Sequence, residues 1–339
     1  MKVLVLSTGG TIGSTLRSGI IFSDAKNIAP VLLEKYNEKY KNDIEFDFRS
    51  IDNILSENIT DDFYNTLFNQ LIKMGLNGYD GIVILHGSDT ISYTSSLAAI
   101  ALRHITAPVA FVCSNLILSD ERSNGLFNFH MAIEYFKQGG KGFVVPYINS
   151  DGRAFIHLAT RIREADSITN DFISIGELPL AEYIDEEFVF TKSPRLPTKM
   201  ELAQPKAAIF MKEVNFSNKI LLIKCYPSID YSVYDFSKNK PSAILQIAYH
   251  SGTASCANDE ANLPNFIENC KKQDIDFYIA SVKRTNETYE TSEQIKKSGA
   301  IELYNLTIES ALARLKVAYN QQKYNPEIIT TQTLYFERI

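Results

Sequence analysis

Short apolar runs alternate with amphipathic segments along the first half of the chain. Residues 3–6 and 82–85 are uniformly apolar and too short to form helices. A strand that is apolar at every position is typical of a parallel sheet covered on both faces. Similar runs follow at 109–112 and 142–145, with helical patterns between them. The pattern predicts an α/β fold with a large, doubly wound and mainly parallel sheet.

Local signals predict the elements around these strands. Pro30 favours the first turn of a helix, so we expect a helix to start near it. Thr60 is a good N-terminal cap for the helix that follows. Residues 44–50 alternate apolar and polar positions, which predicts a strand nearer the sheet edge. Small polar residues and glycines at 14–22 predict a mobile flap, and residues 150–153 predict a hairpin that ends this region.

A change in composition after residue 190 divides the chain. Three prolines between positions 194 and 205 predict a linker over 191–218. It would separate an N-terminal α/β domain, 1–190, from a smaller C-terminal α/β domain, 219–339. In the second domain we expect strands at 220–223, 243–247 and 277–280, and helices at 230–238, 262–271 and 307–319.

Composition limits the partners of the protein. The 339 residues carry a net charge of −6, and no basic run is visible. Because phosphate binding relies on clustered Lys and Arg, we expect no nucleic acid and no membrane as partner. The N-terminal apolar run is shorter than the core of a signal peptide, and no apolar stretch has the length of a membrane span. We therefore expect a cytoplasmic protein.

The sequence also argues against a metal and a cofactor. Its four cysteines are widely spaced, with no CxxC pair and no histidine at ligand spacing. The first glycine cluster, Gly9-Gly10-x-x-Gly13, does not match GxGxxG, and no GK[ST] follows it. We expect neither metal nor cofactor. We also expect His86 to be structural and Tyr93 to pack.

Two glycine-bearing turns follow the two buried apolar runs. Residues 7–13 contain Thr11, and residues 86–90 contain Ser88 and Asp89. Loops at the carboxyl ends of parallel strands line the ligand crevice, so the two hydroxyl-rich turns are expected to converge on one site. A lone threonine in such a turn could equally serve only as a hydrogen-bonding cap. The turns by themselves leave both interpretations open.

Together with the loop Ser56–Thr60 and with Ser123–Gly125, the turns resemble the bacterial L-asparaginase/glutaminase family, most closely its cytoplasmic type I members. The family signatures TGGTI and HGTDT stand here as Thr8–Ile12 and His86–Thr90. The resemblance covers nearly the whole chain. It implies the asparaginase fold, with the site at the carboxyl edge of the N-terminal sheet and an amino-acid amide as the small-molecule substrate.

The resemblance also implies roles for the residues that would act on the amide. Thr11 Oγ would attack the side-chain amide of L-asparagine, release ammonia, and leave a β-aspartyl ester that water cleaves. Ser88 matches the second threonine of the family. Backbone N–H groups in the tight turns at Gly10 and Gly87 would hold the developing oxyanion.

Three further residues match the family's substrate-recognition positions. Asp89 matches the aspartate that binds the α-ammonium group. Ser56 and Glu57 match the loop that recognises the amino-acid end, with hydroxyl and backbone donors for the α-carboxylate and a carboxylate for the ammonium.

Two residues depart from the family pattern. Ile20 stands where the flap carries a tyrosine, and Arg163 stands where a lysine acts as proton relay. Arginine cannot serve as a base, because its guanidinium stays protonated. Three interpretations remain open: a slower asparaginase in which Arg163 supplies only a fixed charge, a pocket shaped for a larger or different amide, or a protein that binds a ligand without hydrolysing it.

The resemblance further implies assembly. Family members complete each site with the C-terminal domain of a partner subunit, and the matching stretch here is His250–Thr253. We therefore expect a homodimer or a homotetramer. A third functional hypothesis is the amidase subunit of a tRNA-dependent amidotransferase. That protein would usually carry an extra N-terminal domain, whereas Thr11 lies close to Met1.

Overall fold

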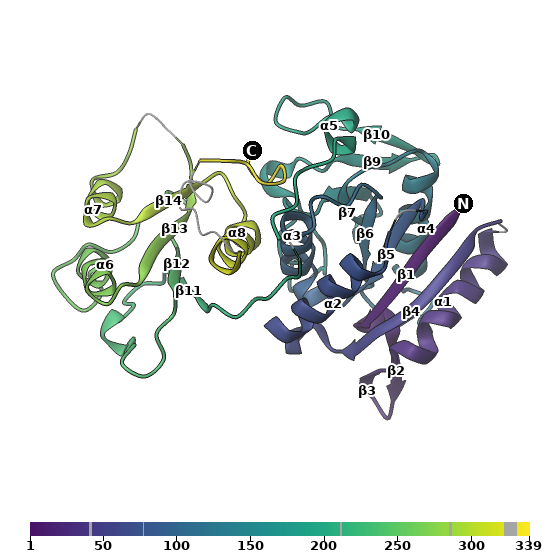
Figure 1. The fold of residues 1–339 in the computed structure, drawn as a ribbon, viewed down its shortest axis with the longest axis horizontal. Helices are drawn as coiled ribbons and strands as arrows, with labels where there is room; N and C mark the ends of the chain where they lie inside the picture. The colour runs from purple at the N-terminus through teal and green to yellow at the C-terminus, as the bar shows by residue number, and fades with distance from the viewer. Residues whose placement is uncertain (41–42, 77, 211, 285–286, 322–330) are drawn as a thin grey trace. The chain divides into compact units, whose positions relative to one another are not determined.

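A computed structural model of the chain describes residues 1–40, 43–76, 78–210, 212–284, 287–321 and 331–339 (Figure 1). The chain divides into two units, Met1–Val214 and Asn215–Ile339. The division falls inside the segment 191–218 that the sequence predicts to be a linker. The limits of the two domains and of the linker remain predictions.

The first unit is built on an eight-stranded sheet with the order β10-β9-β8-β7-β6-β5-β1-β4. The strands from β4 to β7 in this order run parallel, and β8, β9 and β10 extend the sheet antiparallel. The predicted α/β fold with a large, mainly parallel sheet is thus confirmed. The strands are β1 (Lys2–Gly9), β4 (Glu45–Ile54), β5 (Gly81–Leu85), β6 (Val109–Val112), β7 (Phe143–Ile148), β8 (Ala154–Leu158), β9 (Ala181–Ile184) and β10 (Glu187–Phe190).

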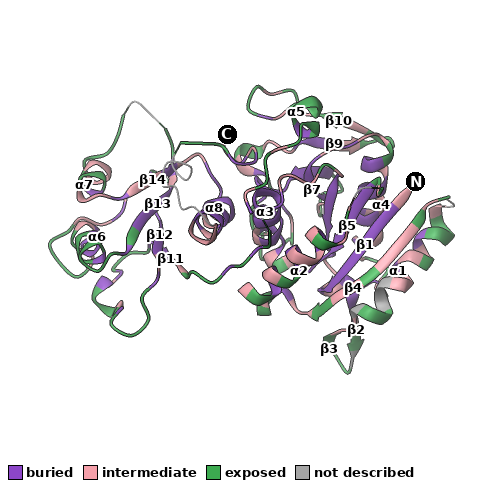
Figure 2. Cartoon of the chain, viewed as in Figure 1, coloured by how far each residue is buried: buried purple, intermediate pink, exposed green. Residues whose placement is uncertain are grey.

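The burial of these strands follows their place in the sheet. β5 and β6 are buried at every position, and β1 is buried at all but its first. β4 is an edge strand whose residues are all intermediate or exposed, which agrees with the edge position predicted for residues 44–50. Figure 2 shows the central strands buried and β4 partly exposed. The apolar runs therefore become the centre of the sheet because only there are both faces covered.

Helices cover both faces of this sheet, with α1 and α4 on one and α2 and α3 on the other (Figure 1). Thr60 caps α2 as predicted, since its hydroxyl accepts a hydrogen bond from Phe63 N. The start predicted for the first helix is wrong. Helix α1 begins at Ala25, so Pro30 lies inside it, and near its start the Asn27 N–H donates to the Asp24 carbonyl. The helices are α1 (Ala25–Tyr40), α2 (Asp61–Lys73), α3 (Ile91–Ala101), α4 (Gly125–Lys137) and α5 (Lys199–Ala203).

The predicted flap is a hairpin of β2 (Ser14–Arg17) and β3 (Ile20–Ser23). Hydrogen bonds hold its base: Ser14 Oγ donates to the Gly10 carbonyl at 2.7 Å, and Ser23 Oγ donates to Asn53 Oδ1 at 2.7 Å. Beyond the base, four apolar side chains are largely exposed, namely Leu16, Ile20, Ile21 and Phe22. The hairpin is therefore anchored to the first glycine turn and presents apolar surface to solvent.

The second unit has a four-stranded parallel sheet with the order β11-β12-β13-β14. Helices α6 and α7 pack on one face, and α8 packs on the other (Figure 1). The predicted second α/β domain and all three of its expected strands are confirmed. The elements are β11 (Ile220–Lys224), β12 (Ala243–Ile247), α6 (Leu263–Lys272), β13 (Asp276–Val282), α7 (Glu290–Ser298), β14 (Ile301–Tyr304) and α8 (Ile308–Asn320).

One helix predicted in this unit is wrong. Residues 230–238 contain only a 3₁₀ turn, Tyr231–Val233. Asp230 accepts a hydrogen bond from Ser232 N, and Asp235 accepts one from Ser237 N. Such local side-chain bonds satisfy the backbone outside a helix and so compete with helix formation.

A buried ion pair ties the C-terminal residues to α8. Arg314 of α8 and Glu337 are hydrogen-bonded, and both side chains are fully buried. Glu337 also accepts backbone N–H groups from Leu334 at 2.8 Å and from Tyr335 at 2.6 Å. The carboxylate is thus surrounded by donors.

Within the described residues, no helix combines the length and apolar character that crossing a bilayer requires.

Candidate active site

Three loops meet at one edge of the large sheet. β1 lies between β4 and β5, and all three strands run parallel. Their carboxyl ends therefore lie at the same edge, and each is followed by a short 3₁₀ turn: Thr11–Gly13 after β1, Ser56–Asn58 after β4 and Ser88–Thr90 after β5. The sheet topology thus brings the predicted hydroxyl-bearing turns to one place.

Two glycines place the backbones of these loops in direct contact. Gly10 has φ 77°, and a Cβ atom on it would lie 2.3 Å from Gly87 N. A Cβ on Gly87 would lie 2.4 Å from Ser56 Oγ. Such distances are far below van der Waals contact, so neither position accepts a side chain without displacing its neighbour. Gly10, Gly87 and Ser56 therefore form the closely packed centre of the site.

Hydrogen bonds between the loops fix this arrangement. Thr90 Oγ1 donates to the Ser56 carbonyl at 3.0 Å, and Gly10 N donates to the Ile54 carbonyl at 3.2 Å. Thr8 Oγ1 donates to the Leu85 carbonyl at 2.9 Å. Each of the three loops is thereby bonded to at least one of the others. A site with such fixed backbone groups is preorganised for a ligand.

The predicted functional side chains differ in exposure. Thr11 and Ser88 are half-buried, whereas Glu57 and Asp89 are exposed. Ser56 is buried. Within the described residues, the Thr11 hydroxyl has no hydrogen-bond partner. Two partly accessible hydroxyls and two exposed carboxylates therefore stand on the three turns that meet at the glycine centre, a set that can meet an amide and an ammonium group.

His86 is the first residue of the second turn, residues 86–90. It is fully buried, and its Nδ1 donates to the Gly87 carbonyl at 2.8 Å. Burial lowers the pKa of His86 to about 4, partly opposed by the bond to Gly87. The ring is therefore neutral near pH 7 and orients the carbonyl that precedes Ser88. This geometry agrees with a structural role for His86.

We predict that two buried histidines make the protein acid-labile. Burial lowers the pKa of His86 to about 4 and that of His157 to about 3, from an ordinary value of 6.5. Below pH 6.5 both histidines bind a proton in the unfolded chain but not in the folded chain. The free energy of unfolding therefore decreases as the pH is lowered. Two protons correspond to about 2.7 kcal/mol per pH unit. Urea midpoints at pH 7, 6 and 5 measure the effect.

A matched variant separates this effect from general acid sensitivity. His157→Gln should reduce the slope between pH 6.5 and 5 by about half, since one of the two buried groups is then absent. The side chain of His157 bonds Ser174 Oγ through Nδ1 at 2.8 Å, which a glutamine amide can also do. An unchanged slope in this variant would contradict the assignment.

Arg163 is not brought to the glycine centre by any described contact. It is exposed, and its backbone N–H donates to the Ile173 carbonyl at 3.1 Å. Its neighbour Glu164 accepts a hydrogen bond of 2.5 Å from the Tyr93 hydroxyl. Tyr93 lies in the first turn of α3, four residues after Asp89. Segment 163–164 is therefore linked to the helix that follows the second turn.

The sequence interpretation missed this link, because it assigned Tyr93 to packing. Tyr93 and Glu164 are far apart in the chain, and no local pattern signals their bond. Ile20 lies on the flap hairpin, where it is 60% exposed.

In the described part of the chain, no group of three His, Cys, Asp or Glu side chains could hold a metal ion.

Comparison with known proteins gives consistent findings. A family model described as "Asparaginase, N-terminal" matches residues 2–196. One subunit of the glutamyl-tRNA(Gln) amidotransferase of Saccharolobus solfataricus is 30% identical over 241 residues, which are 68% of this chain and 51% of that protein. The corresponding subunit of Sulfolobus acidocaldarius is 25% identical over 331 residues, or 93% of this chain and 70% of that protein. The chain thus spans about half the length of the first relative.

Solved structures resemble the whole chain. The thermostable L-asparaginase from Thermococcus kodakarensis has a TM-score of 0.80 at 22% identity, covering 100% of this chain and 99% of that one. L-asparaginase I from Vibrio cholerae has a TM-score of 0.78 at 21% identity, with the same coverage. At such identities the likeness shows the fold alone.

Proposed function

Since the chain belongs to the asparaginase family, we propose that it is an amidohydrolase that converts L-asparagine to L-aspartate and ammonia through an acyl-enzyme on Thr11. The contact among Gly10, Gly87 and Ser56 carries this proposal. It holds three loops together at the carboxyl edge of the sheet, beside the partly accessible hydroxyls of Thr11 and Ser88. A preorganised backbone centre next to a free hydroxyl is what acyl transfer from a neutral amide requires.

The proposed reaction has two stages. In the first, Thr11 Oγ attacks the amide carbon, the C–N bond breaks, and the nitrogen leaves as ammonia after receiving a proton. In the second, water attacks the β-aspartyl ester, frees Thr11 and gives aspartate. The turn N–H group at Gly87 stabilises the oxyanion in both stages, whereas the N–H of Gly10 already donates to the Ile54 carbonyl. One such donor is worth about 10²- to 10³-fold in rate.

Substrate orientation follows from the charges around this centre. Asp89 and Glu57 are exposed carboxylates that suit the α-ammonium group of an amino acid. Burial, and after it the charge of Asp89, raises the pKa of the Cys113 thiol, so Asp89 lies near the carboxyl end of β6. In this proposal, Ser56 and its loop hold the α-carboxylate, and Ser88 takes part in proton handling.

A second candidate is glutamine hydrolysis that supplies ammonia to a transferase. It is favoured by the 30% identity with the amidotransferase subunit of Saccharolobus solfataricus, whose name denotes action on glutamyl-tRNA. Both candidates use the same attack on a side-chain amide. They differ by one methylene in the substrate, which is typically worth about 10- to 200-fold in discrimination.

The two departures from the family pattern favour a site that differs in its proton path. Arg163 can supply positive charge but cannot accept a proton. We propose that it has an electrostatic role in catalysis rather than a relay role. The apolar flap with Ile20 supports the alternative of a different amide, and a protein that binds without hydrolysis remains the non-enzymatic alternative.

We predict that purified protein releases ammonia from L-asparagine with a kcat/KM at least tenfold above that for L-glutamine. The panel should also contain asparaginyl peptides and other amides, with ammonia as the readout. Preference for glutamine would support the second candidate. Absence of ammonia from every amide, together with binding of one of them, would instead support the ligand-binding alternative.

Assembly and location complete the proposal. The loop His250–Thr253 would serve the site of a partner subunit, in a homodimer or homotetramer of closed symmetry. The protein would act in the cytoplasm on a small amino-acid amide, without a metal or cofactor.

A further inference from the structure

The proposed reaction needs a group that accepts a proton. Thr11 and Ser88 offer hydroxyls, and the guanidinium of Arg163 stays protonated. Asp89 and Glu57 are proposed for the α-ammonium group of the substrate, and pairing with a cation makes a carboxylate a weaker base. General acid–base catalysis typically contributes about 10²- to 10⁴-fold to a rate. A further carboxylate at this edge of the sheet would therefore have a large effect.

The segment after β8 is attached to the helix that follows the second turn. In α3, Ser96 Oγ donates to the Ala159 carbonyl at 2.9 Å, and the Tyr93 hydroxyl donates to Glu164 Oε1 at 2.5 Å. Tyr93 lies in the first turn of α3, which directly follows the turn Ser88–Thr90. These two bonds place the carboxylate of Glu164 against the N-terminal end of α3.

The direction of the Tyr93 side chain brings Glu164 toward the second turn. Long side chains in α-helices point back toward the N-terminus of their helix and cover the preceding turn. The Tyr93 ring therefore leans toward Ser88 and Asp89. Because its hydroxyl is bonded to Glu164, it holds that carboxylate beside the turn that carries Ser88.

The side chain of the preceding residue points to the other side. Ile162 forms an antiparallel bridge with Ser174, and Arg163 N donates to the Ile173 carbonyl at 3.1 Å. Successive side chains of such an extended segment alternate between its two sides. Glu164 therefore lies on the side of the fully buried Ile162, toward α3, and Arg163 lies on the opposite side. Of these two neighbours, the structure brings the glutamate to the site.

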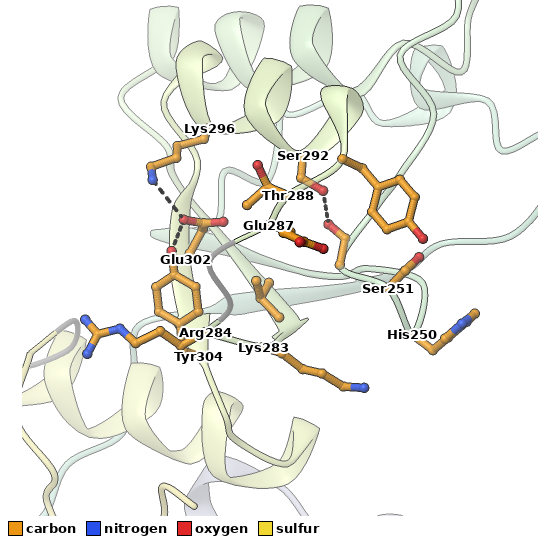
Figure 3. Close-up of a pocket in the computed structure, with 13 residues that line it drawn as sticks. His250, Ser251, Lys283, Arg284, Glu287, Thr288, Ser292, Lys296, Glu302 and Tyr304 are labelled. Atoms are coloured by element: carbon orange, nitrogen blue, oxygen red, sulfur yellow. Dashed lines mark hydrogen bonds and ion pairs between the residues drawn. The ribbon is translucent and has the colours of Figure 1, made fainter.

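A second pair of a phenol and a carboxylate lies in a different environment. In the second unit, the Tyr304 hydroxyl donates to Glu302, which also lies 3.7 Å from Lys296 Nζ (Figure 3). The Glu302 side chain is only 14% exposed, and the lysine already matches its charge. Glu164 is exposed instead. Its carboxylate is therefore accessible to a reacting hydroxyl in a way that the carboxylate of Glu302 is not.

We propose that the Glu164 carboxylate is the proton acceptor of the reaction at Thr11, an inference that rests on the proposed function. In the first stage, the Thr11 proton passes to Ser88 Oγ while the Ser88 proton passes to Glu164. As the C–N bond breaks, a proton returns along the same path to the leaving nitrogen and gives ammonia. In the second stage, the path takes a proton from the attacking water and returns one to Thr11 Oγ. Tyr93 is a positioning residue that holds the carboxylate.

Ammonia release from L-asparagine by the protein and by its Glu164→Gln variant tests the proposal. Glutamine keeps the shape of glutamate and can still accept the Tyr93 hydrogen bond, but its amide does not take up a proton. We expect kcat to fall by about 10²- to 10⁴-fold with little change in KM, and the urea midpoint to stay the same. Glu187→Gln is the matched control, since Glu187 is exposed on β10 at the other edge of the sheet.

Two further variants separate proton transfer from positioning. Glu164→Asp keeps a carboxylate and should retain more activity than Glu164→Gln. Tyr93→Phe removes only the hydrogen bond to the carboxylate and should lower kcat about tenfold.

The pH profile of kcat is the second readout, because it reports the ionisation of groups in the enzyme–substrate complex. Its acidic limb should be lost in Glu164→Gln and retained in Tyr93→Phe. The other ionisable groups at this edge, Asp89, Glu57, Arg163 and Tyr93, are all present in Glu164→Gln.

The outcomes distinguish two kinds of failure. If the parent protein releases no ammonia from any amide, both the proposed function and the role of Glu164 are overturned. If the parent is active and Glu164→Gln keeps its kcat or its acidic limb, only the role of Glu164 is overturned. A fall in kcat that is accompanied by a lower urea midpoint and an unchanged pH profile would make Glu164 a structural residue and would also overturn the proposal.

Discussion

Replacing Thr11 with alanine should lower the rate of ammonia release from asparagine by about 10⁴-fold or more, because no acyl-enzyme can form without the hydroxyl. The fold should not change. Thr11 is half-buried, and its hydroxyl bonds no described residue, so its removal leaves no buried polar group unpaired. The measurements are kcat/KM by ammonia assay and the urea midpoint by circular dichroism.

Two controls define the result. Thr11→Ser keeps a hydroxyl at the same place and should retain measurable hydrolysis. Thr15→Ala removes a nearby threonine hydroxyl on the flap hairpin and should retain most of the activity. Full activity of Thr11→Ala with an unchanged substrate range would remove Thr11 from the reaction and would leave only its role in the turn.

Replacing Glu337 with alanine should destabilise the second unit by about 3–5 kcal/mol, since it leaves the fully buried Arg314 without its carboxylate. The substitution also removes the acceptor for two backbone N–H groups, those of Leu334 and Tyr335. Burial lowers the pKa of the Arg314 guanidinium, and the charge of Glu337 partly opposes this shift. The urea midpoint of the second unit measures the loss.

A double variant tests whether the isolated charge is the cause. Arg314→Met with Glu337→Gln removes both charges and keeps an amide oxygen for the Leu334 and Tyr335 N–H groups. Most of the lost stability should return, as replacing both members of a buried pair is often neutral. Asp120→Asn, which breaks an exposed pair with Arg122, should leave the urea midpoint unchanged. A double variant as unstable as Glu337→Ala would point to packing instead.

The sequence predicts the large sheet well because its signal is local. Runs such as residues 82–85 are apolar at every position, and only a strand between two covered faces satisfies that pattern. Helix α7 was not predicted, because its residues are mostly polar and only Ile295 is buried. Without an apolar stripe, the helix period leaves no trace in the sequence. The helix start predicted near Pro30 was wrong, since a proline in the second turn of a helix costs a hydrogen bond but does not forbid the helix.

The sequence predicts which residue types stand in the candidate site, but it does not predict the long-range hydrogen bonds around it. The two glycine turns stand directly after apolar runs, so their meeting follows from strand order. The bond between Tyr93 and Glu164 joins residues far apart in the chain, and nothing near either residue signals it. The register shift between β13 and β14, where Ser281 has φ 66°, likewise has no marker such as glycine or proline in the sequence.

The central place of β1 also has a consequence for synthesis of the chain. β1 is buried on both faces and pairs with β4 and β5, yet roughly 70 residues separate its end from the start of β5. At about 5–20 residues per second, a ribosome needs several seconds to make that segment. During this interval at least one edge of β1 is unpaired, because β4 can pair with only one of its two edges, and that edge is available to other chains. Shielding of the nascent chain by a chaperone should therefore raise the yield of folded protein more than it would for a hairpin-based fold of similar size.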